Sequence, residues 1–396
     1  MIVQAESLEV YPVVDEILRA VEGTYVNEVD LGAMAWSNEL ALHVIEFKTN
    51  GPARDLHGLP ALFEENVRRV NRLLRPLGGR LMPAAMHPWM DPYAELRLWP
   101  HDYSPIYEAY NRIFDCRGHG WANLQSVHIN LPFAGDDEFA ALHAAIRVVL
   151  PLLPGLAASS PIADGKPTGF QDYRLDVYRT NAARIPSITG DVIPEQIFSE
   201  ADYRAHILGR MYKDIATEDP EGILQDEWLN SRGAIARFDR NTIEIRVLDI
   251  QECPQADLAI VGLVVWLLRA LVSGRWVPVS RLQEWRTSDL KAVYDTTVRQ
   301  GDAAPIDSGA YSECFGLKGA GALTVGKLWK HLHSIFLQDL DPEHTPLYAP
   351  LNVILDEGTL SRRILKAAGE APSRARLGEV YGNLCRCLEE GRMFHA

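Results

Sequence analysis

Alternation of apolar and polar side chains predicts three strands with polar residues on one face. They cover residues 43–49 (HVIEFKT), 125–131 (QSVHINL) and 242–249 (TIEIRVLD). Successive side chains of a strand point to opposite faces, so residues two apart share a face. Glu244 and Arg246 therefore lie together, as do His128 and Asn130. We expect a sheet with one apolar side on the core and one polar side that carries Glu, His, Asn and Arg.

The rest of the pattern is mainly helical. Apolar residues at helical spacing predict helices at residues 13–22, 57–77, 136–150 and 255–273. Residues 36–49 alternate loosely and are predicted as one strand. The polar stretch 158–169 is a long loop, and such loops are more often functional than idle. Strands interspersed with long helices, without regular alternation, predict an α+β fold with an antiparallel or mixed sheet.

Two regions follow from the change of pattern near residue 275. Residues 1–275 hold the predicted strands and are expected to form the catalytic sheet-and-helix domain. Residues 276–396 are mostly amphipathic and helical, and we expect this region to pack on the same domain.

Composition narrows the class of protein. A net charge of -14 disfavours nucleic acid as a partner, because binding its phosphates needs a basic surface. The longest apolar stretch, residues 258–272, contains Gly262 and Arg269 and is predicted as a buried helix, so no membrane partner is expected. Five cysteines do not form an even disulfide framework, and no secretion leader opens the chain. We therefore expect a cytoplasmic protein.

Three residues on the polar faces are candidate metal ligands: Glu46, His128 and Glu244. A carboxylate in an apolar strand needs a partner, because an unpaired buried charge is costly. An ion pair with an arginine would satisfy Glu46 equally, but the recurrence of such residues favours Mg²⁺ ligation. Glu39 lies seven residues before Glu46, which in one regular strand places it on the other face, so it ranks lower.

Arginines and amides near these positions suggest an anionic ligand. Arg246 shares a face with Glu244, and its planar guanidinium can bind a phosphate or carboxylate through two hydrogen bonds. A structural ion pair across the sheet is the alternative. Arg232 and Arg237 precede the third strand, and Gln125 and Asn130 extend the polar face of the second. We assign these four residues to cofactor binding.

One glycine pattern comes close to a phosphate-binding loop. Residues 321–327 have the G-x-x-x-x-G-K spacing, but Leu328 follows where Ser or Thr would hold Mg²⁺. We predict only a loop that enters a helix. No G-x-S-x-G elbow is present, which disfavours a serine hydrolase.

Four short motifs, in order, resemble the type 2 glutamate–cysteine ligase family of carboxylate–amine ligases. They are SNEL at 37–40 with EFKT at 46–49, SVHINL at 126–131, ASSP at 158–161 with TG at 168–169, and IEIRVLD at 243–249. The resemblance implies a glutamine-synthetase-like fold. In that fold a curved, mostly antiparallel sheet holds ATP and Mg²⁺ on its concave face and helices on its convex face.

The resemblance also implies a reaction. ATP phosphorylates a substrate carboxylate, typically the γ-carboxylate of glutamate, and an amine, typically that of cysteine, displaces the phosphate. Glu46, His128 and Glu244 match positions expected to hold metal, and Arg246 matches the position that faces the phosphate. Arg174, after the polar loop, matches a clamp for a substrate carboxylate. The substrates are then small molecules, and a homodimer is the default assembly.

One departure keeps two other functions open. Members of the family begin with a strand of Gly-x-Glu-x-Glu type, whereas residues 1–6 resemble only the end of such a strand. We expect either a shortened version of the family or a member without those ligands, and the latter would favour a degenerate nucleotide- or amino-acid-binding protein. A guanidino phosphotransferase is the other alternative, with Cys253 as its reactive thiol.

Overall fold

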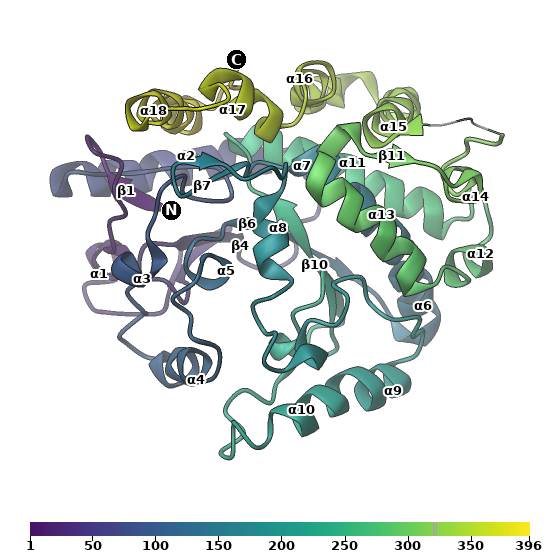
Figure 1. Ribbon diagram of the computed structural model, residues 1–396, viewed down its shortest axis with the longest axis horizontal. Helices are drawn as coiled ribbons and strands as arrows, with labels where there is room; N and C mark the ends of the chain where they lie inside the picture. The colour runs from purple at the N-terminus through teal and green to yellow at the C-terminus, as the bar shows by residue number, and fades with distance from the viewer. Residues whose placement is uncertain (320, 322) are drawn as a thin grey trace.

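The computed structural model describes residues 1–319, 321 and 323–396. Helices surround several short strands, and the strand pairs within this part of the chain are antiparallel. An α+β fold with antiparallel pairing is therefore confirmed. Figure 1 places β4 (Ile45–Thr49), β6 (Ser126–Pro132) and β10 (Thr242–Asp249) in the middle of the molecule.

The first three-stranded sheet corrects the prediction of one strand over residues 36–49. β2 (Glu28–Asp30), β3 (Met34–Asn38) and β4 pair in that order, and Ser37 lies opposite Glu46. The chain reverses between β3 and β4. There the backbone bonds to another segment, with Leu42 N donating to Arg97 O and Trp99 N donating to Leu40 O. Side-chain alternation therefore does not continue from one strand into the next.

The second three-stranded sheet has β10 between β6 and β9 (Ala234–Arg237). Glu244 lies opposite Asn130, and the pairing shifts register between Ile245 and Leu248. Within this irregular stretch, Arg246 N donates to Gly233 O at 2.9 Å. A Cβ atom at Gly233 would lie 2.7 Å from Val247 Cγ1, so only glycine permits this close approach.

Shorter strand pairs complete the sheets. They are β1 (Ile2–Gln4) with β5 (Gly79–Leu81), β7 (Ile162–Ala163) with β8 (Lys166–Pro167), and β11 (Pro305–Ile306) with β12 (Leu323–Thr324). The β7–β8 hairpin lies within the stretch 158–169, which was predicted as a loop throughout.

The four predicted helices are confirmed. They are α1 (Val14–Glu22), α2 (Leu59–Leu74), α6 (Gly135–Val149) and α11 (Pro254–Val272). α11 packs against α2, α6 and α16 (Pro350–Glu357), which explains its apolar composition on all sides. Its length and composition would suffice to cross a membrane, but 67% of the apolar window is buried within the protein, as in a core helix.

The other helices cover the strands from several sides, and α16, α17 and α18 lie along one edge of the molecule (Figure 1). They are α3 (Pro92–Glu95), α4 (Ser104–Phe114), α5 (His119–Ala122), α7 (Pro154–Ala157), α8 (Tyr173–Tyr178), α9 (Glu200–Tyr203), α10 (Gly209–Ile215), α12 (Val279–Gln283), α13 (Thr287–Gln300), α14 (Gly309–Glu313), α15 (Val325–Asp339), α17 (Leu360–Ala368) and α18 (Arg374–Glu390). α15 begins within the G-x-x-x-x-G-K pattern, as predicted, while residue 322 of that pattern lies outside the described residues.

A buried ion pair joins β10 to the polar loop and to α8. Asp249, at the end of β10, pairs with Arg174 and accepts hydrogen bonds from Ser159 N and Ser160 Oγ, both at 2.8 Å. The side chains of Arg174 and Asp249 are 2% and 0% exposed. A second buried carboxyl, Asp172, lies close by, and burial together with Asp249 raises its pKa well above the usual range. The positive charge of Arg174 therefore acts on two buried carboxyl groups, those of Asp249 and Asp172.

Replacing Arg174 with Met should strongly destabilise the fold. The change leaves Asp249 without its counter-charge, and breaking a buried pair typically costs about 3–5 kcal/mol. Urea unfolding of Arg174→Met measures the loss. Arg286→Met is the control, because Arg286 is 72% exposed and its surface pair with Asp289 should contribute little to stability. Equal losses in the two variants would contradict a structural role for the Arg174–Asp249 pair.

Candidate active site

Two carboxylates come from the β3–β4 sheet. Glu46 on β4 is 37% exposed, accepts a hydrogen bond from Ser37 Oγ at 2.6 Å and lies 3.6 Å from Lys48 Nζ. Glu39 directly follows β3 and is open to solvent, although protein surrounds it on several sides. That surrounding protein and the nearby Glu46 raise the pKa of Glu39 to about 7. The carboxyl groups of Glu39 and Glu46, which repel one another when both are ionised, thus lie close together.

A second group lies on β10 and β6. Glu244 Oε1 is 3.0 Å from Arg246 Nε and 3.3 Å from His128 Nδ1, and the Glu244 side chain is 11% exposed. Burial alone would raise the pKa of Glu244, but Arg246 and His128 outweigh it and hold this pKa well below the usual range. Glu244 is therefore a persistent anion that already has two partners.

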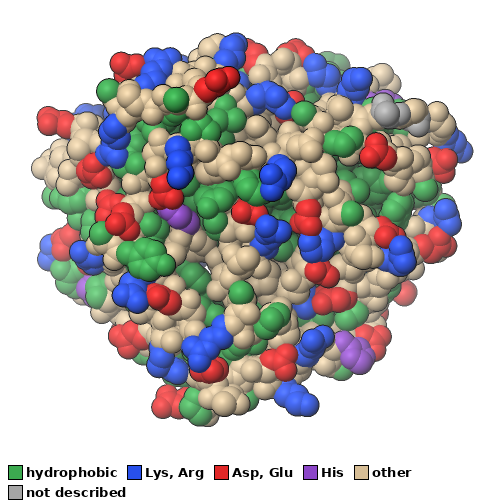
Figure 2. Space-filling view, in the orientation of Figure 1, with side chains coloured by type: hydrophobic (Ala, Val, Ile, Leu, Met, Phe, Trp, Pro, Cys, Tyr) green, Lys and Arg blue, Asp and Glu red, His purple; other side chains and the backbone are tan. Residues whose placement is uncertain are grey.

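Arg246 connects the two groups. Its positive charge lowers the pKa of Glu39, which opposes the effects of burial and of Glu46. The guanidinium is held from behind, since its Nη1 donates to Asn230 O at 3.1 Å, and its side chain keeps 23% exposure. Carboxylates from two sheets thus converge on one arginine. The face seen in Figure 2 is hollowed near its centre, where Figure 1 places these strands.

The structure brings together five of the nine predicted site residues, namely Glu46, His128, Asn130, Glu244 and Arg246. Asn130 is exposed on β6 opposite Glu244. Their roles as ligands stay predictions. Among the residues that the structure describes, no three His, Cys, Asp or Glu side chains are arranged as a ready-made metal cluster.

The other four predicted residues already have protein partners. Arg174 pairs with Asp249 in the core, and Arg232 pairs with Glu195 through two bonds of 2.6 Å while only 3% exposed. Gln125 donates to Ala84 O at 2.5 Å and is 8% exposed. Each of these three side chains is buried and bonds to other parts of the fold. The structure therefore does not place it in the cleft, the open site that holds Glu39, Glu46, Glu244 and Arg246. Arg237 binds Asp239 at 2.9 Å, but its charge still acts on Glu244.

Glu39 is the residue that sequence reasoning placed too low. The odd spacing from Glu46 seemed to put it on the opposite face, but that argument assumed one continuous strand. Because β3 and β4 are separate antiparallel strands, the spacing across their connection says nothing about which face Glu39 occupies. The turn-forming Asn38 before Glu39 was the available signal.

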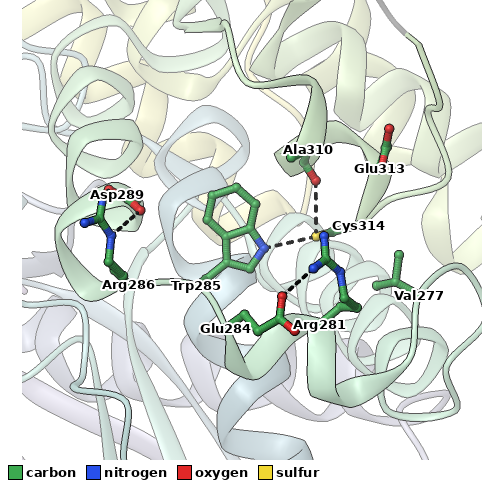
Figure 3. A pocket seen from close by; sticks show the side chains of 9 residues that line it. All are labelled: Val277, Arg281, Glu284, Trp285, Arg286, Asp289, Ala310, Glu313 and Cys314. Carbon is green, nitrogen blue, oxygen red and sulfur yellow. Dashed lines mark hydrogen bonds and ion pairs between the residues drawn. The ribbon is translucent and has the colours of Figure 1, made fainter.

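The cavity in Figure 3 lies elsewhere and contains none of the predicted site residues. It encloses about 280 Å³ between α12, α13 and α14. Arg281 turns to Glu284, Arg286 turns to Asp289, and Trp285 Nε1 donates to Cys314 Sγ at 3.3 Å (Figure 3). Four of its five charged side chains are thus paired with one another, Glu313 being the fifth.

Comparison with known proteins adds the family. A model of glutamate–cysteine ligase family 2 matches residues 3–385, nearly the whole chain. The chain belongs to this family. Membership places it among carboxylate–amine ligases and confirms the resemblance carried by the four motifs.

Relatives of the family differ in how much of the chain they match. An uncharacterized protein of Archaeoglobus fulgidus is 33% identical over 98% of this chain and 96% of its own length. The "Putative glutamate--cysteine ligase 2-1" of Rubrobacter xylanophilus is 25% identical over 72% of this chain and 71% of its own length. The protein of the same name in a Nocardioides species is 31% identical, but over only 45% of this chain and 42% of its own length.

Among solved structures, the Pup ligase PafA in complex with ADP matches with a TM-score of 0.38 at 12% identity. The match covers 95% of this chain and 64% of PafA. A likeness this distant does not inform the fold or the site.

Replacing Glu39 with Gln should change the pH dependence of stability. The folded-state pKa of Glu39 is about 7 against an ordinary value of 4.5. The protonated carboxyl therefore favours folding below pH 4.5, and this contribution is lost as the pH rises through 7. Relative to wild type, Glu39→Gln should gain stability between pH 4.5 and pH 8.

Urea unfolding at these two pH values measures the gain, with Glu108→Gln, an exposed carboxylate of α4, as the control. Parallel pH profiles for wild type and Glu39→Gln would contradict the raised pKa of Glu39.

Proposed function

We propose that the chain is an ATP- and Mg²⁺-dependent ligase that forms an amide through an acyl phosphate. The carboxylate is that of glutamate or a similar amino acid, and the amine is that of cysteine or another small amine. The observation that carries the proposal is that Glu39 and Glu244, from two sheets, both lie close to Arg246, while Glu46 lies beside Glu39. We further propose that the strands form the glutamine-synthetase-like arrangement that the family resemblance implies.

The carboxylates suit Mg²⁺ in number and kind. Mg²⁺ keeps several waters and is commonly bound by one or two carboxylates together with substrate phosphates, so a preformed cluster of three side chains is not required. Glu39 and Glu46 repel one another, and a divalent cation near them would turn this repulsion into attraction. When bound, Mg²⁺ supplies positive charge to the transferring phosphoryl group.

Arg246 is placed to stabilise negative charge. Its Nε pairs with Glu244 and its Nη1 donates to Asn230 O, which fixes the guanidinium plane. The side chain remains 23% exposed. A fixed cation of this kind acts on charge that develops during phosphoryl transfer and needs no reorganisation at that moment. Arg237 adds positive charge behind Glu244.

The proposed chemistry has two steps. A carboxylate oxygen of the substrate bonds to the γ-phosphorus of ATP as the bond to ADP breaks. The amine nitrogen then bonds to the acyl carbon, phosphate leaves with the bridging oxygen, and the nitrogen loses its surplus protons to solvent. The cleft residues bind and orient the reactants, since phosphoryl transfer depends on positioning and charge stabilisation.

The structure gives little support to a guanidino phosphotransferase. Such an enzyme would need a reactive thiolate, whereas Cys253 is 1% exposed and burial raises the pKa of its thiol well above the usual range.

Mg²⁺ alone should stabilise the protein at pH 8. A ligand that binds only the folded state adds about 2.7 kcal/mol at 100 times its Kd. Thermal unfolding should show a rise in Tm for wild type that is absent in Glu46→Gln. Glu28→Gln is the matched control, because Glu28 contacts the same Lys48 at 2.6 Å and is not a proposed ligand. A shift of the same size in Glu46→Gln would remove Glu46 from the metal site.

Turnover should depend on Glu244 and Arg246. The assay follows ADP and phosphate release from ATP, Mg²⁺ and glutamate with a panel of amines that includes cysteine. We expect amine-dependent release in wild type and none in Glu244→Ala. Arg246→Lys should lose at least about tenfold in kcat/KM, because a point charge does not replace the guanidinium fork.

Arg240→Lys controls for a conservative change at an arginine that is 63% exposed. Wild-type kinetics in Arg246→Lys would make Arg246 a structural residue. ATP binding without amine-dependent release would favour the degenerate binding protein instead.

A further inference from the structure

Tyr103 stands out among the strained residues of the chain. In the described part of the chain, seven non-glycine residues have positive φ: Leu8, Ala84, Tyr103, Asp115, Asp164, Val192 and Asn241. Asp and Asn tolerate this conformation, and Leu8, Ala84 and Val192 are buried, where packing compensates for the strain. Tyr103 is bulky and yet 55% exposed, so packing of its ring does not explain its presence.

The strain at Tyr103 comes from a fixed turn. Ser104 N donates to His101 O at 2.9 Å, and Tyr103 has φ 73° and ψ -7°, which are the angles of the third residue of a type II turn. That position favours glycine. The turn is held by Trp99 Nε1, which donates to Asp102 O at 2.8 Å. A tyrosine in this conformation is strained, because its Cβ atom crowds the backbone where glycine has none.

The turn lies beside the candidate active site. Tyr107, one helical turn after Tyr103 on α4, accepts a hydrogen bond from Asn38 Nδ2 at 3.0 Å, and Asn38 directly precedes Glu39. The pKa of Tyr107 is raised by burial, by the charge of Glu39 and, more weakly, by Tyr103. Tyr103 therefore lies one helical turn from a residue that contacts the Glu39 end of the site, and its ring is exposed.

We propose that the ring of Tyr103 is the stacking platform for the purine base of the nucleotide. The inference rests on the proposed function. Among the proposed reactants, the nucleotide is the one with a planar aromatic group, and its phosphates would lie at the carboxylates and Arg246. Stacking on an aromatic side chain is a common way to bind a base, and such a role gives a reason to keep a strained tyrosine in this turn.

The test uses a substitution that separates stability from binding. Tyr103→Gly removes the ring and also relieves the positive φ, so its Tm should equal or exceed that of wild type. Calorimetric titration with ADP and Mg²⁺ should show about tenfold weaker binding to Tyr103→Gly and nearly unchanged binding to Tyr103→Phe. Inorganic tripolyphosphate, which lacks a base, should bind wild type and Tyr103→Gly equally.

Tyr93→Ala serves as the control, because Tyr93 is a 70% exposed tyrosine on α3 with helical backbone. Unchanged ADP affinity in Tyr103→Gly, with wild type binding both probes, would overturn the stacking role and leave the proposed function intact. An equal loss of ADP and tripolyphosphate binding would also overturn it. Wild type that binds neither probe would overturn the proposed function and the stacking role together.

Discussion

The geometry of the site depends on the buried pair between Arg174 and Asp249. Asp249 ends β10, the strand that carries Glu244 and Arg246, and Arg174 belongs to the first turn of α8. The same carboxylate receives two hydrogen bonds from the polar loop. The loop and α8 are thus fixed to the sequence-distant strand β10 at one buried point, and β10 has a defined position relative to the loop. Such a pair is costly to desolvate, so its value lies in specifying an arrangement more than in net stability.

The cleft has the opposite electrostatic character. Glu39, Glu46 and Glu244 lie in an open site, and burial together with the nearby Glu46 raises the pKa of Glu39. Glu244 is paired with Arg246 and His128, and Glu46 lies 3.6 Å from Lys48, so the repulsion between Glu39 and Glu46 is only partly offset. A site that keeps this repulsion gives up some stability, the kind of compromise expected where function and folding compete.

Much of this arrangement was predictable from sequence, and the failures have identifiable physical causes. The amphipathic helix α2 and the apolar core helix α11 were found because one long pattern fixes many residues at once. β6 and β10 were found for the same reason. They supply four of the five predicted site residues that the structure brings together.

Arg174 and Arg232 were misplaced because sequence shows that an arginine lies near a strand but not whether a partner carboxylate already occupies it. Glu39 was ranked low because local alternation cannot reveal a reversal whose backbone groups bond to a distant segment. The pairing of distant groups is a property of the fold, and it decides which polar residues remain available to a ligand.

The two charged regions should respond differently to ionic strength. Mobile ions screen solvent-exposed charges over about 8 Å at physiological salt and hardly reach charges that lie inside the protein. The Arg174–Asp249 pair is almost inaccessible, whereas Glu39 and Glu46 stand open to solvent. Salt therefore weakens the repulsion in the cleft and leaves the buried anchor unchanged. The repulsion between Glu39 and Glu46 is therefore strongest in dilute buffer, and we expect a divalent cation to stabilise the protein most under that condition.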